Sequence, residues 1–510
     1  MQIRNKRLAK NTLFLYVRML LVMIVALFTS RVVLEVLGFT DYGVYGVVGG
    51  VVTIFEFLND SMSQAASRYY CFEIGRKDYT RLNKIFNVIL LSHAGISIIV
   101  ILLCETVGLW LLYDKLVMPE TQMRVISWVF QISVLSSILR ILTVPFSALI
   151  VAFEQMHIYA YIGMVDAVFK LLIAYCLFII PGSKLLIYAL LMLGAQFLLN
   201  LFYIIYSSRK FSAAIKWNFC KEKSLYKEVF GYASSTLIGN ISGMAQGQGI
   251  NILLNIFFGP IVNAARGIAA QVQGNVQKFS NNFTTALNPQ IIKLCAEKNY
   301  KEMFVLVDRS SCLSFYLLWF LVLPILLNTP YILKLWLGKY PEYSVIFINI
   351  VLWISLVNAI KIPRSIIFQG LGKVRLINIA IGGMLATSLP ISYIFLKIGF
   401  PSYSVFVITL IITILTEFVS VLILKKYIKF SGTKYMLNVH FRCLMVIILS
   451  GILPYIEILH RETVNFGDFV VNVLITSLSI LITIMLIGFD KNTRKIIINH
   501  LGKRLKFING

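Results

Sequence analysis

The chain has 510 residues, of which 58% are hydrophobic and only 14% are charged, and its formal net charge is +25. A soluble domain carries about 25% charged residues and could not bury this much apolar surface, so the composition predicts an integral membrane protein. The seven cysteines show neither paired spacing nor a metal pattern, and we interpret them as free thiols. No metal or other cofactor is predicted.

Apolar segments long enough to cross a bilayer as helices recur along the whole chain, and such a helix needs about 20 residues. We predict an all-α membrane fold with about 14 transmembrane helices. The first apolar run is too long for a signal peptide and lacks a small-residue cleavage site, so it is interpreted as an uncleaved span. The predicted spans are 12–37, 41–66, 83–111, 124–149, 157–180, 185–207, 227–258, 260–287, 304–328, 343–368, 374–397, 402–424, 437–459 and 468–489.

Basic residues are distributed unequally between the two sets of connections. The two ends and the even-numbered loops hold 30 lysines and arginines, whereas the alternate connections hold seven. The positive-inside rule therefore places both termini in the cytoplasm. It also accounts for the net charge without nucleic acid, because the bases are spread over short loops. An amphipathic segment around Trp217, after the sixth span, is predicted to lie on the inner leaflet.

Two sequence phrases recur in equivalent places. "GRKDYTRLNKIF" from Gly75 matches "AEKNYKEMFVLV" from Ala296, and "VPFSALIVAFEQMHIY" matches "IPRSIIFQGLGKVRLI", at offsets of 221 and 218 residues. These two anchors predict a duplication of six helices, with both halves running the same way about an axis along the membrane normal. The predicted parts are an N-terminal lobe at 1–208, a linker at 209–226, a C-terminal lobe at 227–430, two further helices at 431–490 and a basic tail at 491–510.

Charged side chains inside spans normally face a cavity or a partner, because each costs at least about 2.5 kcal/mol at the bilayer centre. Six bases have no obvious acid in their own helix and are the candidate substrate-binding cations. They are Arg18, Arg140, Arg266, Lys278, Lys361 and Arg364.

The acidic residues of the spans leave more than one interpretation open. Glu56 and Asp60, one turn apart, could bind a coupling proton or cation or could balance nearby arginines. Asp166 is a third coupling candidate, although its spacing from Lys170 also fits an internal ion pair.

Spans 7 and 8 are unusually rich in amides. The amides either line a hydrated cavity compatible with sugar hydroxyls or bond helices together. The candidates are Asn240, Gln246, Gln248, Asn251, Asn255, Asn263, Gln271 and Asn275. Because bases outnumber acids, an anionic substrate is favoured, and arginine can hold phosphate oxygens bidentately. We find no P-loop, zinc-protease or catalytic-triad motif, so an enzyme is not favoured.

The phrases "TSRVVLEVLGFTDYGVYGVVGGVV" and "YILKLWLGKYPEYSVIF", with the fourteen-span plan, resemble Wzx-type polysaccharide flippases of the multidrug/oligosaccharidyl-lipid/polysaccharide (MOP) superfamily. The resemblance implies export of an undecaprenyl-diphosphate-linked oligosaccharide across the bacterial inner membrane for O-antigen or capsule synthesis. It also implies contact with membrane lipids, a coupling ion (H⁺ or Na⁺), and polysaccharide polymerase or chain-length proteins as partners. Related lipid II flippases use arginines in helices 1, 2 and 8; Arg18 and Arg266 lie in corresponding helices, whereas span 2 has Glu56 and Asp60.

Two alternatives remain open at this point. A cation-coupled multidrug exporter of the same architecture would favour an acidic or apolar pocket, whereas bases are in excess here. A membrane polymerase or ligase would require a sizeable outer loop, and the longest predicted outer connections, near 112–123, 329–342 and 460–467, are short.

Overall fold

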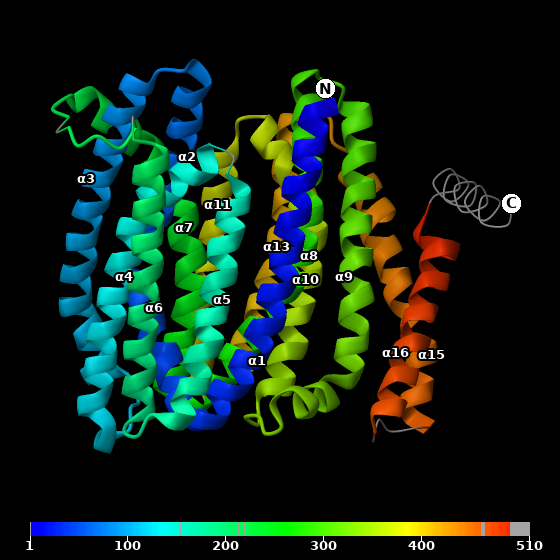
Figure 1. Ribbon diagram of the computed structural model, residues 1–510. Coiled ribbons are helices and arrows are strands. Elements are labelled where there is room, and N and C mark those ends of the chain that lie inside the picture. The colour runs from blue at the N-terminus through cyan, green and yellow to red at the C-terminus, as the bar shows by residue number, and fades with distance from the viewer. Residues whose placement is uncertain (1, 154, 213, 219, 461–464, 490–510) are drawn as a thin grey trace, which may run out of the picture. The chain divides into compact units, whose positions relative to one another are not determined.

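The computed structural model describes residues 2–489 apart from 154, 213, 219 and 461–464. Side chains are described from residue 21 onward, apart from residues 156, 235, 236, 238, 239, 282, 285, 286, 288, 289, 296, 374 and 457–460. This part of the chain is helical throughout (Figure 1). The elements are α1 (Gln2–Ile54), α2 (Phe57–Arg76), α3 (Tyr79–Leu103), η1 (Cys104–Gly108), η2 (Leu111–Lys115), η3 (Glu120–Gln122), α4 (Met123–Ala152), α5 (Met156–Ile179), α6 (Lys184–Lys210), α7 (Lys223–Phe258), α8 (Pro260–Ala296), α9 (Tyr300–Leu337), α10 (Ser344–Gly370), α11 (Val374–Ala386), α12 (Ser388–Lys397), α13 (Ser404–Tyr427), α14 (Gly432–Tyr435), η4 (Met436–Phe441), α15 (Arg442–His460), α16 (Phe466–Thr483) and η5 (Ile484–Gly488).

Within the described residues, eleven helical stretches are long and apolar enough to cross a membrane. The other three long helices, α2, α7 and α8, correspond to predicted spans 2, 7 and 8. They carry most of the polar side chains that the sequence places inside spans. The predicted all-helical membrane fold is therefore confirmed, and the polarity of these three helices indicates that parts of them do not face lipid.

Several predicted span boundaries differ from the structure. The range 41–66 was expected to form one helix, but it contains the end of α1 at Ile54 and the start of α2 at Phe57. Gly38 was expected to end the first helix, whereas α1 continues past it through a kink with φ 73°. Similarly, the range 374–397 is divided at Thr387 into α11 and α12. Hydropathy does not register such breaks, because the residues on both sides of each break are apolar.

The backbone repeats where the first sequence anchor predicts it. Gly38 has φ 73° and ψ 174°, and Gly259 has φ 76° and ψ −175°, conformations that favour glycine. Lys77 and Lys298 are the only non-glycine residues of the described chain with positive φ, at 60° and 55°. Each lysine follows a helix end and precedes a residue whose side chain caps the next helix.

The second anchor repeats in the same way at its offset of 218 residues. Pro145 and Pro363 both lie inside helices. Two residues further on, the hydroxyl of Ser147 donates to the carbonyl of Val144 (3.1 Å), and the hydroxyl of Ser365 donates to that of Ile362 (2.7 Å). The local geometry therefore confirms the predicted six-helix repeat.

The chain divides into two compact units, residues 1–267 with 385–405 and residues 268–384 with 406–510. The predicted lobe, linker and tail boundaries stay predictions. In the first unit α4 packs on α6, α1 on α5, and α2 on α7. The core of this unit includes the fully covered valines Val44, Val47 and Val48 of α1. In the second unit α9 packs on α10, and α15 and α16 form a helical hairpin (Figure 1).

Charged and amide side chains fasten the predicted linker to the first unit. Asn83 of α3 donates to the carbonyls of Ala214 (2.9 Å) and Lys216 (2.7 Å). Lys84 pairs with Glu222, just before α7 begins. The start of α7 is thereby held against α3, while the side chain of Trp217 is exposed.

Candidate functional site

The first unit contains a cavity of about 300 Å³ between four helices. Most of one wall is the α1 segment around Gly46, Gly49 and Gly50, where the lack of side chains leaves backbone at the surface. The other lining residues are Tyr45, Val52 and Thr53 of α1, Ile132, Ser133, Ser136 and Arg140 of α4, Ala189 of α6 and Gln248 of α7. The wall therefore combines one guanidinium with hydroxyl, amide and peptide groups.

Arg140 is the cation of this cavity. Its side chain is 50% exposed, and its Nη2 lies 3.1 Å from Oε1 of Glu56, whose side chain is 10% exposed. The hydroxyl of Ser137 donates to the same carboxylate oxygen at 2.6 Å. Glu56 lies where the helix is broken between α1 and α2, so its carboxylate meets α4 from a turn. The structure thus brings together one predicted cation and one predicted coupling carboxylate.

The remaining predicted cations lie in different surroundings. Arg266 donates to the carbonyl of Gly247 in α7. Lys278 donates to Asn275 of its own helix at 3.0 Å. Lys361 donates to Thr416 of α13 at 3.0 Å. Arg18 belongs to α1, but its side chain lies outside the described residues.

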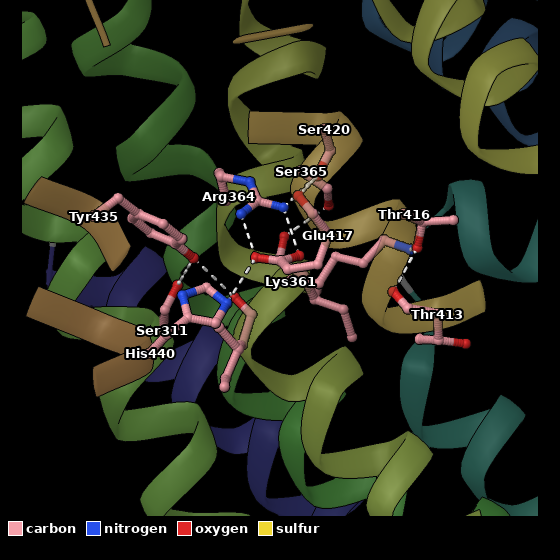
Figure 2. Close-up of polar contacts among 12 residues, drawn as sticks. Ser311, Lys361, Arg364, Ser365, Thr413, Thr416, Glu417, Ser420, Tyr435 and His440 are labelled. Atoms are coloured by element: carbon pink, nitrogen blue, oxygen red, sulfur yellow. Dashed lines mark hydrogen bonds and ion pairs between the residues drawn. The ribbon is translucent and has the colours of Figure 1, made fainter. Parts of the chain in front are cut away.

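Arg364 is held in a buried polar cluster of the second unit (Figure 2). Its guanidinium is 1% exposed and makes a two-pronged contact with the carboxylate of Glu417. It also donates to Ser420 and lies over the ring of Tyr435. His440 approaches the same carboxylate, with its Nε2 3.3 Å from Oε1 of Glu417. Because its donors are engaged by protein groups, we do not place Arg364 among the ligands of the proposed substrate site.

Several of the predicted cavity amides connect helices instead. Asn251, Asn255 and Asn263 are buried and bond to one another: Asn255 Nδ2 donates to Asn263 Oδ1 at 3.0 Å, and Asn263 Nδ2 donates to Asn251 Oδ1 at 2.8 Å. Asn251 also donates to the carbonyl of Gly46 at 3.2 Å, which ties α7 to α1. For these three amides the structure favours helix–helix bonding, the alternative left open by the sequence.

The other predicted amides are partly covered and have different neighbours. Gln248 lines the cavity. Asn240 donates to Ser61 of α2 at 2.9 Å, and the buried Nε2 of Gln246 has no hydrogen-bond partner among the described residues. Gln271 and Asn275 lie on α8, where they stay predictions as cavity residues.

The predicted carboxylates also separate by surroundings. Asp60 is exposed one turn beyond Glu56. Asp166 lies 2.7 Å from Lys170 within α5, so the internal ion pair anticipated from their spacing is present.

Sequence reasoning missed Ser137, Glu417 and His440 as partners of the predicted cations, as well as the glycine-lined wall. A signal for one of them was present: Ser137 and Ser355 are related by the offset of the second anchor.

No family model matches the chain, and no curated protein matches it. Solved structures do. The lipid II flippase MurJ in an inward closed conformation is similar with a TM-score of 0.67 at 12% identity, over 94% of this chain and 98% of MurJ. A mutant of the Vibrio cholerae MATE transporter VcmN is similar with a TM-score of 0.57 at 14% identity, over 84% and 97%. A MOP superfamily transporter from Pyrococcus furiosus, described as having a binding pocket of reverse polarity, is similar with a TM-score of 0.58 at 13% identity, over 80% and 93%.

These likenesses give the chain the fold of MOP superfamily transporters. Together with its eleven apolar helices, the fold makes it a multi-pass membrane protein.

Proposed function

We propose that this protein is a flippase that moves an undecaprenyl-diphosphate-linked oligosaccharide from the inner to the outer leaflet of the bacterial cytoplasmic membrane. The observation that carries the proposal is the half-exposed guanidinium of Arg140 in a cavity whose other polar groups are hydroxyls, an amide and glycine backbone. Guanidinium groups bind phosphate oxygens through paired hydrogen bonds, and amides and hydroxyls both donate to and accept from sugars.

The size of the cavity fits part of such a substrate. At about 300 Å³ it lies at the lower end of small-molecule sites, so it would take the diphosphate and adjoining sugar atoms but not a whole oligosaccharide. The prenyl chain would stay in lipid. Arg18, Arg266, Lys278 and Lys361 stay predictions as further cations along the path. H⁺ or Na⁺ coupling, and partners such as a polymerase or chain-length protein, are likewise predictions that the resemblance implies.

The proposal is tested by deleting the gene and restoring it as wild type, Arg140→Ala or Arg140→Lys. Deletion should cause a lipid-linked oligosaccharide to accumulate on the inner leaflet and should abolish surface polysaccharide. We expect Arg140→Ala to restore neither, and Arg140→Lys to restore export in part, because lysine keeps the charge without the two-pronged geometry. Arg209→Ala, at an exposed arginine at the end of α6, is the matched control and should behave as wild type.

A multidrug exporter of the same fold is the second candidate, because Glu56 places a carboxylate beside the cavity. Drug sensitivity is therefore measured in the same strains. If deletion raises drug sensitivity while surface polysaccharide is unchanged, the flippase proposal is wrong. If Arg140→Ala exports normally, Arg140 is not part of the substrate site.

A further inference from the structure

Glu56 occupies a position where the second half of the chain has its uncharged isostere. The residue 221 positions later, the offset of the first anchor, is Gln277. The helix that faces it carries an equivalent serine in each half: Ser137 donates to Oε1 of Glu56 at 2.6 Å, and Gln277 Nε2 donates to Oγ of Ser355 at 3.5 Å. Both halves thus place the same side-chain contact between the same pair of helices.

The charges differ although the contact is shared. Arg140, which binds Glu56, corresponds to Asn358 at the offset of 218 residues. An amide is therefore sufficient for the contact in one half, while the other half keeps a carboxylate and a guanidinium. Ionised groups inside membrane segments are costly and usually functional, so a purely structural role does not account for this pair.

The backbone differs at the same point. In the first half the helix is interrupted at Phe55 and Glu56, whereas α8 is continuous through Gln277. Interrupted helices in transporters commonly form substrate and ion sites, because the break exposes polar groups and allows local movement. The interruption therefore marks the charged half of the repeat as the functional one.

The pair joins the buried protein to the cavity. The carboxylate of Glu56 is largely covered, while the guanidinium of Arg140 is half exposed in the cavity. The groups that face Glu56 are Arg140 and Ser137 from α4, Asp60 from α2, and Cys104 from η1. Arg140 is the cation among these neighbours, and the ionised carboxylate engages it.

We propose that Glu56 is a proton-binding carboxylate that competes with the phosphate groups of the substrate for Arg140. This inference rests on the proposed function of the cavity. When Glu56 is ionised, it holds the guanidinium; when Glu56 takes up a proton, the ion pair is lost, its contact with Ser137 remains, and Arg140 is released to a phosphate oxygen. Proton binding and phosphate binding consequently reinforce each other, and the linkage is reciprocal. A proton bound with the substrate also cancels one negative charge.

The test is the pH dependence of ligand binding by purified, full-length protein in nanodiscs. The probe is a prenyl-diphosphate-linked monosaccharide, in which both phosphates are esterified and stay ionised between about pH 5 and about pH 8. For wild type we expect the dissociation constant to rise with pH, by up to about tenfold per pH unit, which is the limit for one linked proton. Glu56→Gln should bind at all pH values as tightly as wild type does at the lowest pH.

Asp166→Asn is the matched control, because Asp166 pairs with Lys170 inside α5 and does not line the cavity; it should keep the wild-type pH dependence. If wild type binds the probe equally well at every pH, or if Glu56→Gln keeps the pH dependence, this inference is overturned while the proposed function stands. If wild type does not bind the probe at any pH, the proposed function itself fails. Proton uptake by wild type during binding in weak buffer provides a measurement that needs no variant: we expect about one proton per bound probe. No uptake would contradict the inference.

Discussion

Arg364 and Glu417 form a two-pronged ion pair that joins α10 to α13 inside the second unit (Figure 2). Both side chains are almost fully covered, so removing one partner leaves a buried charge. We expect Glu417→Gln to lower the free energy of unfolding by about 3–5 kcal/mol, the usual cost of breaking a buried ion pair from one side. Thermal unfolding of the detergent-solubilised protein measures the effect.

The paired replacement distinguishes a structural role from a functional one. Arg364→Met with Glu417→Met removes both charges, and we expect it to be more stable than Glu417→Gln because neither partner is left alone. Equal destabilisation by the single and paired variants would contradict this account. Export by the folded paired variant would support our exclusion of Arg364 from the substrate site.

The pair also illustrates what the sequence could and could not predict. Helices and their repeat follow from apolar length and from two anchors, because both are local patterns. The Asp166–Lys170 pair was anticipated from its spacing on one helix. Arg364 and Glu417 are 53 residues apart, and their helices are apolar on most sides, so hydropathy does not indicate which faces meet. The cavity was missed for the same reason, since glycines that line a wall and glycines that pack helices together look alike in sequence.

The amide cluster at the junction of α7 and α8 should contribute to stability. Asn255 is fully covered, accepts from the backbone N–H of Val117 at 2.8 Å and donates to Asn263 at 3.0 Å. Asn255→Leu leaves both partners without this residue's bonds, and we expect a loss of about 1–3 kcal/mol in the free energy of unfolding. Asn275→Leu, whose side chain bonds only to an exposed lysine among the contacts described, should change it by about 0.5 kcal/mol or less. A smaller loss for Asn255→Leu than for Asn275→Leu would argue against a structural role for the cluster.

The orientation of the chain in the membrane is open to a direct measurement. Thirty bases at the two ends and even-numbered loops against seven in the alternate connections predict that both ends are cytoplasmic. A periplasmic reporter enzyme should therefore be inactive when fused after Gly510 and active when inserted at Lys339, between α9 and α10. The opposite pattern would reverse the proposed direction of transport.

Two glycines of α1 should separate a packing requirement from a cavity requirement. A Cβ at Gly43 would lie 1.8 Å from the carbonyl oxygen of Pro260, a backbone atom that cannot rotate away. Gly43→Ala should therefore lower the yield of folded protein severely. A Cβ at Gly49 would meet nothing within 4 Å, and Gly49 lines the cavity. Gly49→Leu should thus fold, because its side chain enters open space, yet it should fill part of the cavity and reduce surface polysaccharide at normal protein abundance. Gly49→Ala is the control and should retain most of the export. If Gly49→Leu folds and exports at the wild-type level, the substrate does not occupy this cavity.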